Sequence, residues 1–246
     1  MNPNDQYPPH FAEKYQDIPF VLLDIPRIVP DEIFYPLWAT KSIPILRKKP
    51  DDRYPYTPEE AQKIYEKTEK SNEYTMPNWI GMTAKAGDKA DDRWTQSIFY
   101  GTKALPKFFE QLNDLLPFSY ISQVLFWSNV QEIGLHRDLN EQYPFMSSCR
   151  IMIKDENPQP TFFMEKFSND IGKSFHSRLP NIQDSKFVDL KEKDTNTFLY
   201  NNRSWGHGAL KLPGHSKILC AVAGDFDWVK YETLVDRSLA KYGNNI

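Results

Sequence analysis

The second half of the chain contains six short runs rich in Val, Ile, Phe and Tyr, separated by turn-forming residues. Such runs are typical of β-strands, because branched and aromatic side chains fit a pleated, half-buried surface. Several short strands at these intervals predict a sandwich or a barrel. We therefore expect strands at 120–127, 149–154, 161–166, 186–190, 197–201 and 217–223.

Two helical patterns flank the β-rich region. Apolar residues at three- and four-residue spacing over 103–116 predict a helix that packs on the core. After Gly224, either Asp225 or Asp227 is the expected N-cap of a final helix, which ends near Gly243. The architecture expected from these patterns is mainly β, with flanking helices outside a β core.

Prolines punctuate the first hundred residues and interrupt regular structure repeatedly. This segment is expected to wrap the core in short pieces. One helix start is signalled there by Thr57 as N-cap and Pro58 at the first helical position. Further along, the polar stretch 167–184 shows no clear period and is expected to form a loop over one mouth of the β core.

Composition limits the function classes. A chain of 246 residues with 40% hydrophobic and 14% aromatic residues is too apolar for disorder and fits one elaborated domain. The net charge of −3 gives no positive field for a polyanion, which disfavours nucleic acid as a partner. Two cysteines and the lack of a long apolar run predict a cytoplasmic protein that does not enter a membrane.

A few residues could hold a metal ion. His136 and Asp138 are two positions apart, and on a strand such residues share one face. His207 lies much later, between Gly206 and Gly208, where the backbone can approach an ion or a ligand closely. Two imidazoles and one carboxylate leave further metal positions open, an arrangement suited to Fe(II).

A lysine follows the second histidine. Lys217 opens an apolar run ten residues after His207, and a cation at the mouth of a buried strand needs an anion. The alternative is that Lys217 extends to solvent and His215 caps a turn.

These residues together carry a family resemblance. The pair His136 and Asp138, the distal His207 and the basic Lys217 resemble the iron(II)/2-oxoglutarate-dependent oxygenases, whose fold is a double-stranded β-helix, the cupin-like jelly roll. Within that superfamily, the chain looks like the aspartyl/asparaginyl β-hydroxylase and proline cis-hydroxylase branch. That likeness comes from the run Cys-Arg-Ile-Met-Ile at 149–153, the segment 160–163 and the run Asn-Thr-Phe-Leu-Tyr-Asn-Asn at 196–202.

The resemblance implies a role for each site residue. His136, Asp138 and His207 would be iron ligands, and Lys217 would bind the distal carboxylate of 2-oxoglutarate. Many relatives have Arg at that last position, and a lysine offers a point charge instead of a bidentate fork. The branch often has His where this chain has Met152.

Two further residues are candidates for binding an anion. By its place on the strand after the first ligands, Arg150 would face the carboxylate of the co-substrate or of the substrate. His215 either shares the anion held by Lys217 or lies at the surface.

The resemblance also implies a domain layout. Residues 1–118 would form a helical, proline-rich segment packed on the core, 119–225 the double-stranded β-helix and 226–246 a C-terminal helix, within one structural domain.

The activity implied is that of a dioxygenase. It would use Fe(II), O2 and 2-oxoglutarate, with ascorbate as a candidate reductant, to hydroxylate a C–H bond of an amino acid or a peptidyl residue while 2-oxoglutarate becomes succinate. The presence of Asp138 favours hydroxylation over halogenation, because halogenating relatives lack this carboxylate. The expected partner is a small-molecule or peptide substrate, and the oligomeric state is left open.

Two alternatives stay open at this point. One is a cupin-type β-barrel that binds a metal or a small molecule without oxygenase turnover. The other is a structural protein in which the spacings are accidental.

Overall fold

The computed structural model describes residues 14–41, 43–44, 78–83, 98–129, 133–136, 148–154, 157–164, 185–201, 205–210 and 212–243. Its helices are α2 (Phe34–Lys41), α4 (Gly101–Ala104), α5 (Pro106–Leu115) and α6 (Trp228–Tyr242). The strands from the first hundred residues are β1 (Phe20–Leu22), β2 (Ile43–Pro44), β3 (Asn78–Thr83) and β4 (Ile98–Tyr100). Those that follow are β5 (Phe118–Asn129), β6 (Ile133–His136), β7 (Ser148–Lys154), β8 (Thr161–Met164), β9 (Lys186–Phe187), β10 (Thr197–Tyr200), β11 (Gly206–Ala209) and β12 (Lys217–Phe226).

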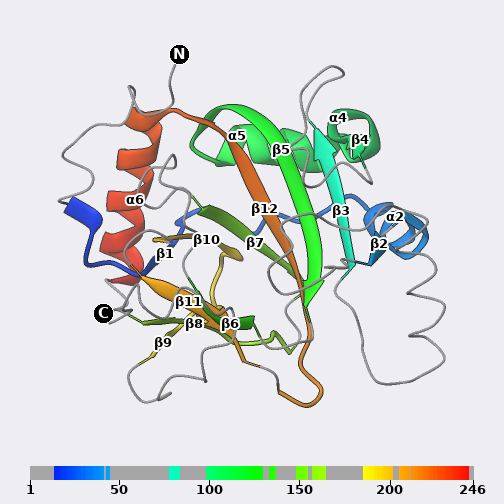
Figure 1. Cartoon of the computed structure of the whole chain (residues 1–246). Helices are drawn as coiled ribbons and strands as arrows, with labels where there is room; N and C mark the ends of the chain where they lie inside the picture. Colours follow the sequence, from blue (N-terminus) through cyan, green and yellow to red (C-terminus); the bar gives the residue numbers. More distant parts are fainter. Residues whose placement is uncertain are drawn as a thin grey trace.

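These strands form two sheets (Figure 1). The larger has eight strands in the order β1-β10-β7-β12-β5-β3-β2, with β4 paired to β3. The smaller has four, in the order β6-β11-β8-β9. Neighbouring strands run antiparallel except for β3 and β4. The expected mainly β architecture is therefore confirmed, and its sheets are mainly antiparallel with few helices.

The chain alternates between the sheets from β5 onward. Strands β5, β7, β10 and β12 belong to the larger sheet, whereas β6, β8, β9 and β11 belong to the smaller. Every connection from β5 to β12 except β8 to β9 thus passes from one sheet to the other. As a result, strands distant in sequence become neighbours, and β11 pairs with both β6 and β8.

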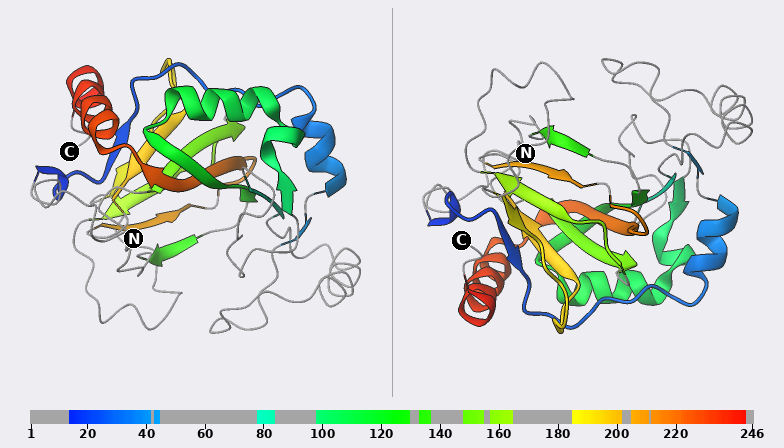
Figure 2. Two further views of the ribbon diagram at one scale, coloured as in Figure 1. Left: turned by 90° about the horizontal axis from the view of Figure 1, so that it is seen from above. Right: turned by 90° about the horizontal axis from the view of Figure 1, so that it is seen from below.

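The larger sheet separates two apolar cores, and Figure 2 shows it lying between α5 and the smaller sheet. On the helix side, Phe108 and Leu112 of α5 belong to one core with Phe126 and Cys220 of the sheet. On the other side, a second core includes residues from both sheets, among them Phe163, Phe198, Tyr200 and Leu219. The space between the two sheets is therefore a packed interior, and we call the surface that each sheet turns toward it the inner face.

Helix α6 is capped at both ends. The Asp227 side chain accepts a hydrogen bond from the backbone N–H of Lys230, so the N-cap is Asp227 and not Asp225. Gly243 follows the last turn with a φ of 77°, a conformation that glycine adopts without strain.

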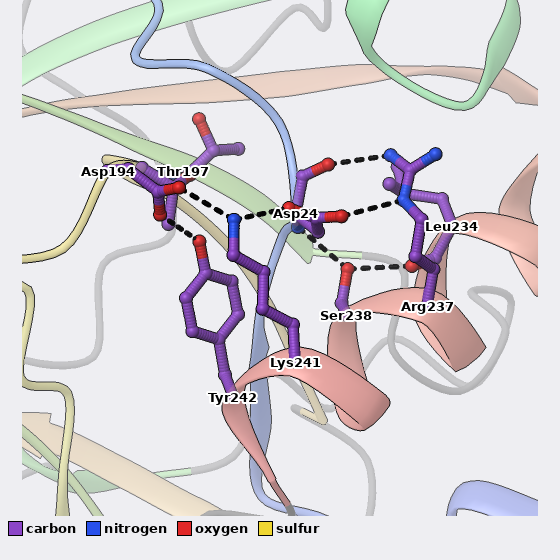
Figure 3. Close-up of polar contacts among 9 residues, drawn as sticks. Asp24, Asp194, Thr197, Leu234, Arg237, Ser238, Lys241 and Tyr242 are labelled. Atoms are coloured by element: carbon purple, nitrogen blue, oxygen red, sulfur yellow. Dashed lines mark hydrogen bonds and ion pairs between the residues drawn. The ribbon is translucent and has the colours of Figure 1, made fainter.

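A polar network ties α6 to the rest of the fold (Figure 3). The Asp24 carboxylate receives Arg237 Nε at 2.8 Å and Lys241 Nζ at 2.6 Å. Lys241 also contacts Asp194 at 2.6 Å, and the Tyr242 hydroxyl donates to the same carboxylate. Because Asp24 follows β1 and Asp194 precedes β10, one helix holds two segments that flank paired strands.

The predicted strands are all present, with β9 shorter than expected. The predicted helix over 103–116 is observed as α5, preceded by the short α4. The first hundred residues contribute four strands to the larger sheet, which their proline-punctuated pattern did not indicate. The helix start at Thr57 and the loop 167–184 lie outside the described residues. Within the described part of the chain, no helix has the length and apolar character needed to cross a bilayer.

Ser238 gives a test of how α6 is anchored. Its buried hydroxyl accepts a hydrogen bond from the Asp24 backbone N–H at 2.8 Å and donates one to the Leu234 carbonyl at 2.6 Å. We expect Ser238→Ala to lower the free energy of unfolding by about 1–2 kcal/mol, because it leaves the Asp24 N–H without its acceptor. Urea denaturation measures this change. In the control Thr233→Ala, which removes an exposed hydroxyl bonded only within the helix, the loss should be under about 0.5 kcal/mol; equal losses in the two variants would contradict the prediction.

Candidate functional site

The two histidines of the predicted metal site occupy opposing positions on neighbouring strands. His207 of β11 pairs directly with His136, the last residue of the antiparallel strand β6. Directly opposed residues on antiparallel strands share one face of the sheet, with Cβ atoms about 4.5–5.5 Å apart. The fold therefore brings together two residues that are far apart in the sequence.

His207 is buried and belongs to the inner face of the smaller sheet. Its ring centroid lies 4.9 Å from that of Tyr200 and 6.1 Å from that of Phe163. Tyr200 belongs to β10 of the larger sheet, so the imidazole lies between the two sheets. An imidazole in these surroundings is shielded from water, since only 7% of His207 is exposed.

Gly208 permits the close approach of β11 to β6. A Cβ atom at this position would lie 2.5 Å from the carbonyl oxygen of Ile133 and 2.6 Å from the Phe162 ring. The register between these strands also shifts between His207 and Ala209. A side chain at Gly208 would therefore push β11 away from β6, next to the position where His207 pairs with His136.

Lys217 places a cation in the same interior. It is 2% exposed, and its Nζ donates to the hydroxyl of Thr161 at 2.7 Å. Burial, and to a smaller extent the positive charge of Arg150, lower the pKa of Lys217 from 10.5 to about 7. Within the described part of the chain, no carboxylate contacts this amine.

Strand register relates Lys217 to His207. Thr161 and Phe163 are two positions apart on β8, so they share a face, and Phe163 is the partner of His207 on β11. The amine of Lys217 therefore reaches the inner face that carries His207. The lysine itself comes from the larger sheet, so its contact with Thr161 bridges the two sheets.

The structure describes two of the three remaining predicted residues, Arg150 and His215. Arg150 is half-buried on β7, and its Nη2 donates to the Tyr200 hydroxyl at 2.8 Å. His215 lies in the turn before β12, with its Nδ1 3.1 Å from the Pro158 carbonyl oxygen. Asp138 lies outside the described residues, and the described part of the chain holds no cluster of three or more His, Cys, Asp or Glu able to bind a metal.

Sequence reasoning did not identify Thr161 and Tyr200 as site residues. Both are in predicted strands, yet the contact of Thr161 with Lys217 and that of Tyr200 with His207 cross from one sheet to the other. The hydrogen bond from Arg150 to Tyr200 joins neighbouring strands of the larger sheet. Nothing in strand composition indicates which residues of two stacked sheets will meet. Side chains alternate between the two faces of a strand, and this alternation could have indicated which residues of each strand face the space between the sheets.

Comparisons with known proteins give matches in three-dimensional structure only. No known protein family matches the chain, and no curated protein matches it. A prolyl-4-hydroxylase of Pseudomonas putida aligns with a TM-score of 0.30 and 9% identity, over 67% of this chain and 82% of that one. A prolyl hydroxylase of Trichoplax adhaerens, solved with a peptide fragment of the hypoxia inducible factor oxygen degradation domain, aligns with a TM-score of 0.39 and 8% identity, over 94% of this chain and 98% of that one. At this level of similarity, neither structure assigns an activity to the chain.

Gly208 also gives a direct test of the site's architecture. We expect Gly208→Ala to lower the free energy of unfolding by about 2 kcal/mol or more, because the added methyl group meets backbone that cannot move aside. The variant should also bind Co(II), used as a probe of the two histidines, at least tenfold more weakly.

The control for this substitution is Gly243→Ala. It forces a side chain into a positive φ at the end of α6, with nothing within 4 Å of the new atom. This control should lose about 1 kcal/mol of stability and keep its affinity for Co(II). Thermal or urea unfolding and calorimetric titration measure both effects, and unchanged Co(II) affinity in Gly208→Ala would contradict the role given to this glycine.

Proposed function

We propose that this protein is an Fe(II)- and 2-oxoglutarate-dependent dioxygenase that hydroxylates a C–H bond of an amino acid or a peptidyl residue. The observation that carries the proposal is the pairing of His136 with His207 on neighbouring strands, together with a buried Lys217 whose amine reaches the same interior as His207 and has no carboxylate partner among the described residues. These groups match what the sequence resemblance implies for iron and for 2-oxoglutarate.

The strand order supports the fold named in this proposal. The eight strands from β5 to β12 divide into four in each sheet, and the chain crosses between the sheets at nearly every connection. This order is that expected of an eight-stranded jelly roll. In the proposed fold, the space between the two sheets is the mouth and interior of the double-stranded β-helix.

The donor set fits a ferrous ion. His136 and His207, which occupy paired positions on β6 and β11, would supply two imidazoles, and Asp138, two residues beyond the end of β6, is the proposed third ligand. Two imidazoles and one carboxylate form the set that leaves open positions on non-haem Fe(II). When bound, the iron would supply the oxygen activation that C–H hydroxylation requires.

The chain's own residues would bind and orient the co-substrate. Protonated Lys217 would pair with the distal carboxylate of 2-oxoglutarate, and the Thr161 hydroxyl fixes the position of the amine. The rings of Tyr200 and Phe163 next to His207 exclude water from the same interior. A charge-assisted hydrogen bond is stronger in such a dry interior than in water.

Conversion of 2-oxoglutarate to succinate tests the proposed activity. With Fe(II) and ascorbate, we expect the protein to release succinate even without an added substrate, and His207→Ala to release at least tenfold less. Co(II) titration provides a second measurement, in which His136→Ala and His207→Ala bind at least tenfold more weakly. Thr233→Ala, which removes an exposed hydroxyl of α6 outside the site, serves as the control and should match the unaltered protein.

The same experiment distinguishes the alternatives. Metal binding that depends on both histidines but yields no succinate would favour the cupin-type binding protein. Failure of both measurements would favour the structural protein with accidental spacings.

The lowered pKa of Lys217 predicts how the affinity for 2-oxoglutarate depends on pH. Below about pH 7 the amine is protonated and ready for a carboxylate, whereas above that pH the neutral amine must take up a proton when the anion binds. We expect the Kd for 2-oxoglutarate to rise by about tenfold per pH unit above pH 7. Titration calorimetry between pH 6 and pH 9 measures this slope.

Lys217→Arg is the matched variant for this measurement. An arginine stays charged over the whole range, so its Kd should show little pH dependence. Removing the charge in Lys217→Ala should weaken binding by tenfold or more at pH 6.5, since the lost contact is worth about 1.5–3 kcal/mol. A flat pH profile in the unaltered protein would contradict the role of Lys217.

A further inference from the structure

The amine of Lys217 differs from that of a surface lysine such as Lys14. Lys217 is buried, and its Nζ donates to the neutral hydroxyl of Thr161, with no carboxylate partner among the described residues. Lys14 is exposed, and its Nζ contacts the carboxylates of Glu232 and Asp236 at 3.0 and 2.7 Å. Carboxylate partners keep an amine protonated, whereas burial without them favours the neutral form. Lys217 therefore presents a neutral amine over a pH range in which Lys14 stays charged.

A second cation faces the same interior. Arg150 is half-buried, and the residues on either side of it on β7 pack on the helix side, so Arg150 occupies the inner face. Its Cζ atom lies 5.2 Å from the centre of the Trp127 ring. Trp127 is the β5 partner of Leu219, which is two positions from Lys217 on β12 and shares its face. The guanidinium thus extends toward the end of the inner face that carries Lys217.

The guanidinium of Arg150 is held in place by neutral groups. Its Cζ atom also lies 4.9 Å from the centre of the Tyr200 ring, so two aromatic rings contact it. Nη2 donates to the Tyr200 hydroxyl at 2.8 Å, and Nη1 donates to the Cys149 carbonyl at 3.1 Å. An arginine stays protonated in a protein. Lys217 therefore faces a permanent positive charge, which favours the neutral amine in the same direction as burial does.

A neutral amine in these surroundings is a nucleophile. Burial and a neighbouring cation are two ways in which proteins activate a lysine. With carbon dioxide, the lone pair of Nζ would attack the carbon atom, and one C–O double bond would give its electron pair to oxygen. One N–H proton would then leave to solvent. The product is a carbamate anion on the lysine, and its formation needs neither an oxidant nor a reductant.

The neighbours of Lys217 suit the product better than they suit a protonated amine. An ammonium group at this position is repelled by Arg150, whereas a carbamate is attracted to it. A buried anion requires a partner of opposite charge and hydrogen-bond donors. Arg150 supplies the charge, and the Thr161 hydroxyl, which accepts from the amine, can donate to a carbamate oxygen.

From this arrangement we propose that Lys217 is a site of reversible modification by carbon dioxide. The carbamate would have Arg150 as its counter-ion and Thr161 as a hydrogen-bond donor. This proposal goes beyond the proposed function and does not rest on it, since no metal ion takes part in the reaction.

Carbon-13 NMR of the full chain tests the modification. The protein is equilibrated at about pH 8 with carbon-13-labelled bicarbonate, which supplies dissolved carbon dioxide, and without 2-oxoglutarate. We expect a carbamate resonance that is at least tenfold weaker in Lys217→Arg. The matched control is Lys14→Arg, which replaces an amine held charged by two carboxylates and should leave this resonance unchanged.

Two further measurements examine the role of each group. Arg150→Gln removes the counter-ion, so the fraction of protein carrying the carbamate should fall at least threefold at the same concentration of carbon dioxide. In the unaltered protein, triethyloxonium converts a carbamate into a stable ethyl ester, and peptide mass mapping should then find this ester at Lys217. The assignment therefore does not depend on the folding of Lys217→Arg.

The outcomes separate this proposal from the proposed function. A protein with no carbamate resonance that is lost in Lys217→Arg and kept in Lys14→Arg, or with the ester only at other amines, would overturn the proposal. Equal carbamate in Arg150→Gln and the unaltered protein would overturn the role of Arg150 as counter-ion. Succinate release without carbamate would support the proposed function alone, and carbamate without succinate release would support this proposal alone.

Discussion

The arrangement of the interior depends on how closely β11 can approach β6. The gap at Gly208 leaves no room for a Cβ atom between this strand and the backbone of Ile133. With that approach in place, antiparallel pairing puts His207 opposite His136. Two residues far apart in sequence thereby reach neighbouring positions through backbone geometry, and the inward placement of His207 follows from its contacts with Tyr200 and Phe163.

The second physical constraint is the charge of the interior. Lys217 and Arg150 both lie on the inner face, where burial, and after it the positive charge of Arg150, disfavours the charged form of Lys217 and lowers its pKa. A fold maximised for stability alone would place apolar side chains at these positions. An anion that pairs with one of these cations would offset the free-energy cost of burying its charge. Binding of the anion would therefore stabilise the folded state. The two cations are held by different groups, Thr161 for Lys217 and two aromatic rings for Arg150.

Much of the fold could be predicted from the sequence because its long strands carry strong local signals. The β-branched and aromatic residues of β5, β7, β10 and β12 indicate strands by themselves, and Asp227 and Gly243 mark the ends of α6. By contrast, β11 reads Gly-His-Gly-Ala and has no β-forming composition; it is a strand because β6 and β8 pair with it on both sides. The four strands of the first hundred residues are likewise defined by pairing partners that lie elsewhere in the chain.

For the candidate site too, the sequence indicated some residues, whereas others depend on contacts that only the fold creates. Local spacing singled out His136, His207 and Lys217, because their residue types and separations are properties of the sequence. Thr161 and Tyr200 could not be found in this way, since their roles arise from contact between two sheets.

The two faces of the larger sheet differ in composition, since one is apolar and the other carries charged side chains. This difference explains how the interior can contain buried charged residues. Along β7, Cys149 and Ile151 pack against the helix side, whereas Arg150 between them faces the smaller sheet. The apolar helix side supplies the burial that stabilises the strands, so the inner face can carry residues that do not add to stability. The polar network of α6 supports this division, because it holds Asp24 and Asp194 at the ends of β1 and β10, and β10 carries Tyr200. Tyr200 in turn contacts both the Arg150 guanidinium and the His207 ring, so the geometry of the interior is set by a strand that is fixed from outside it.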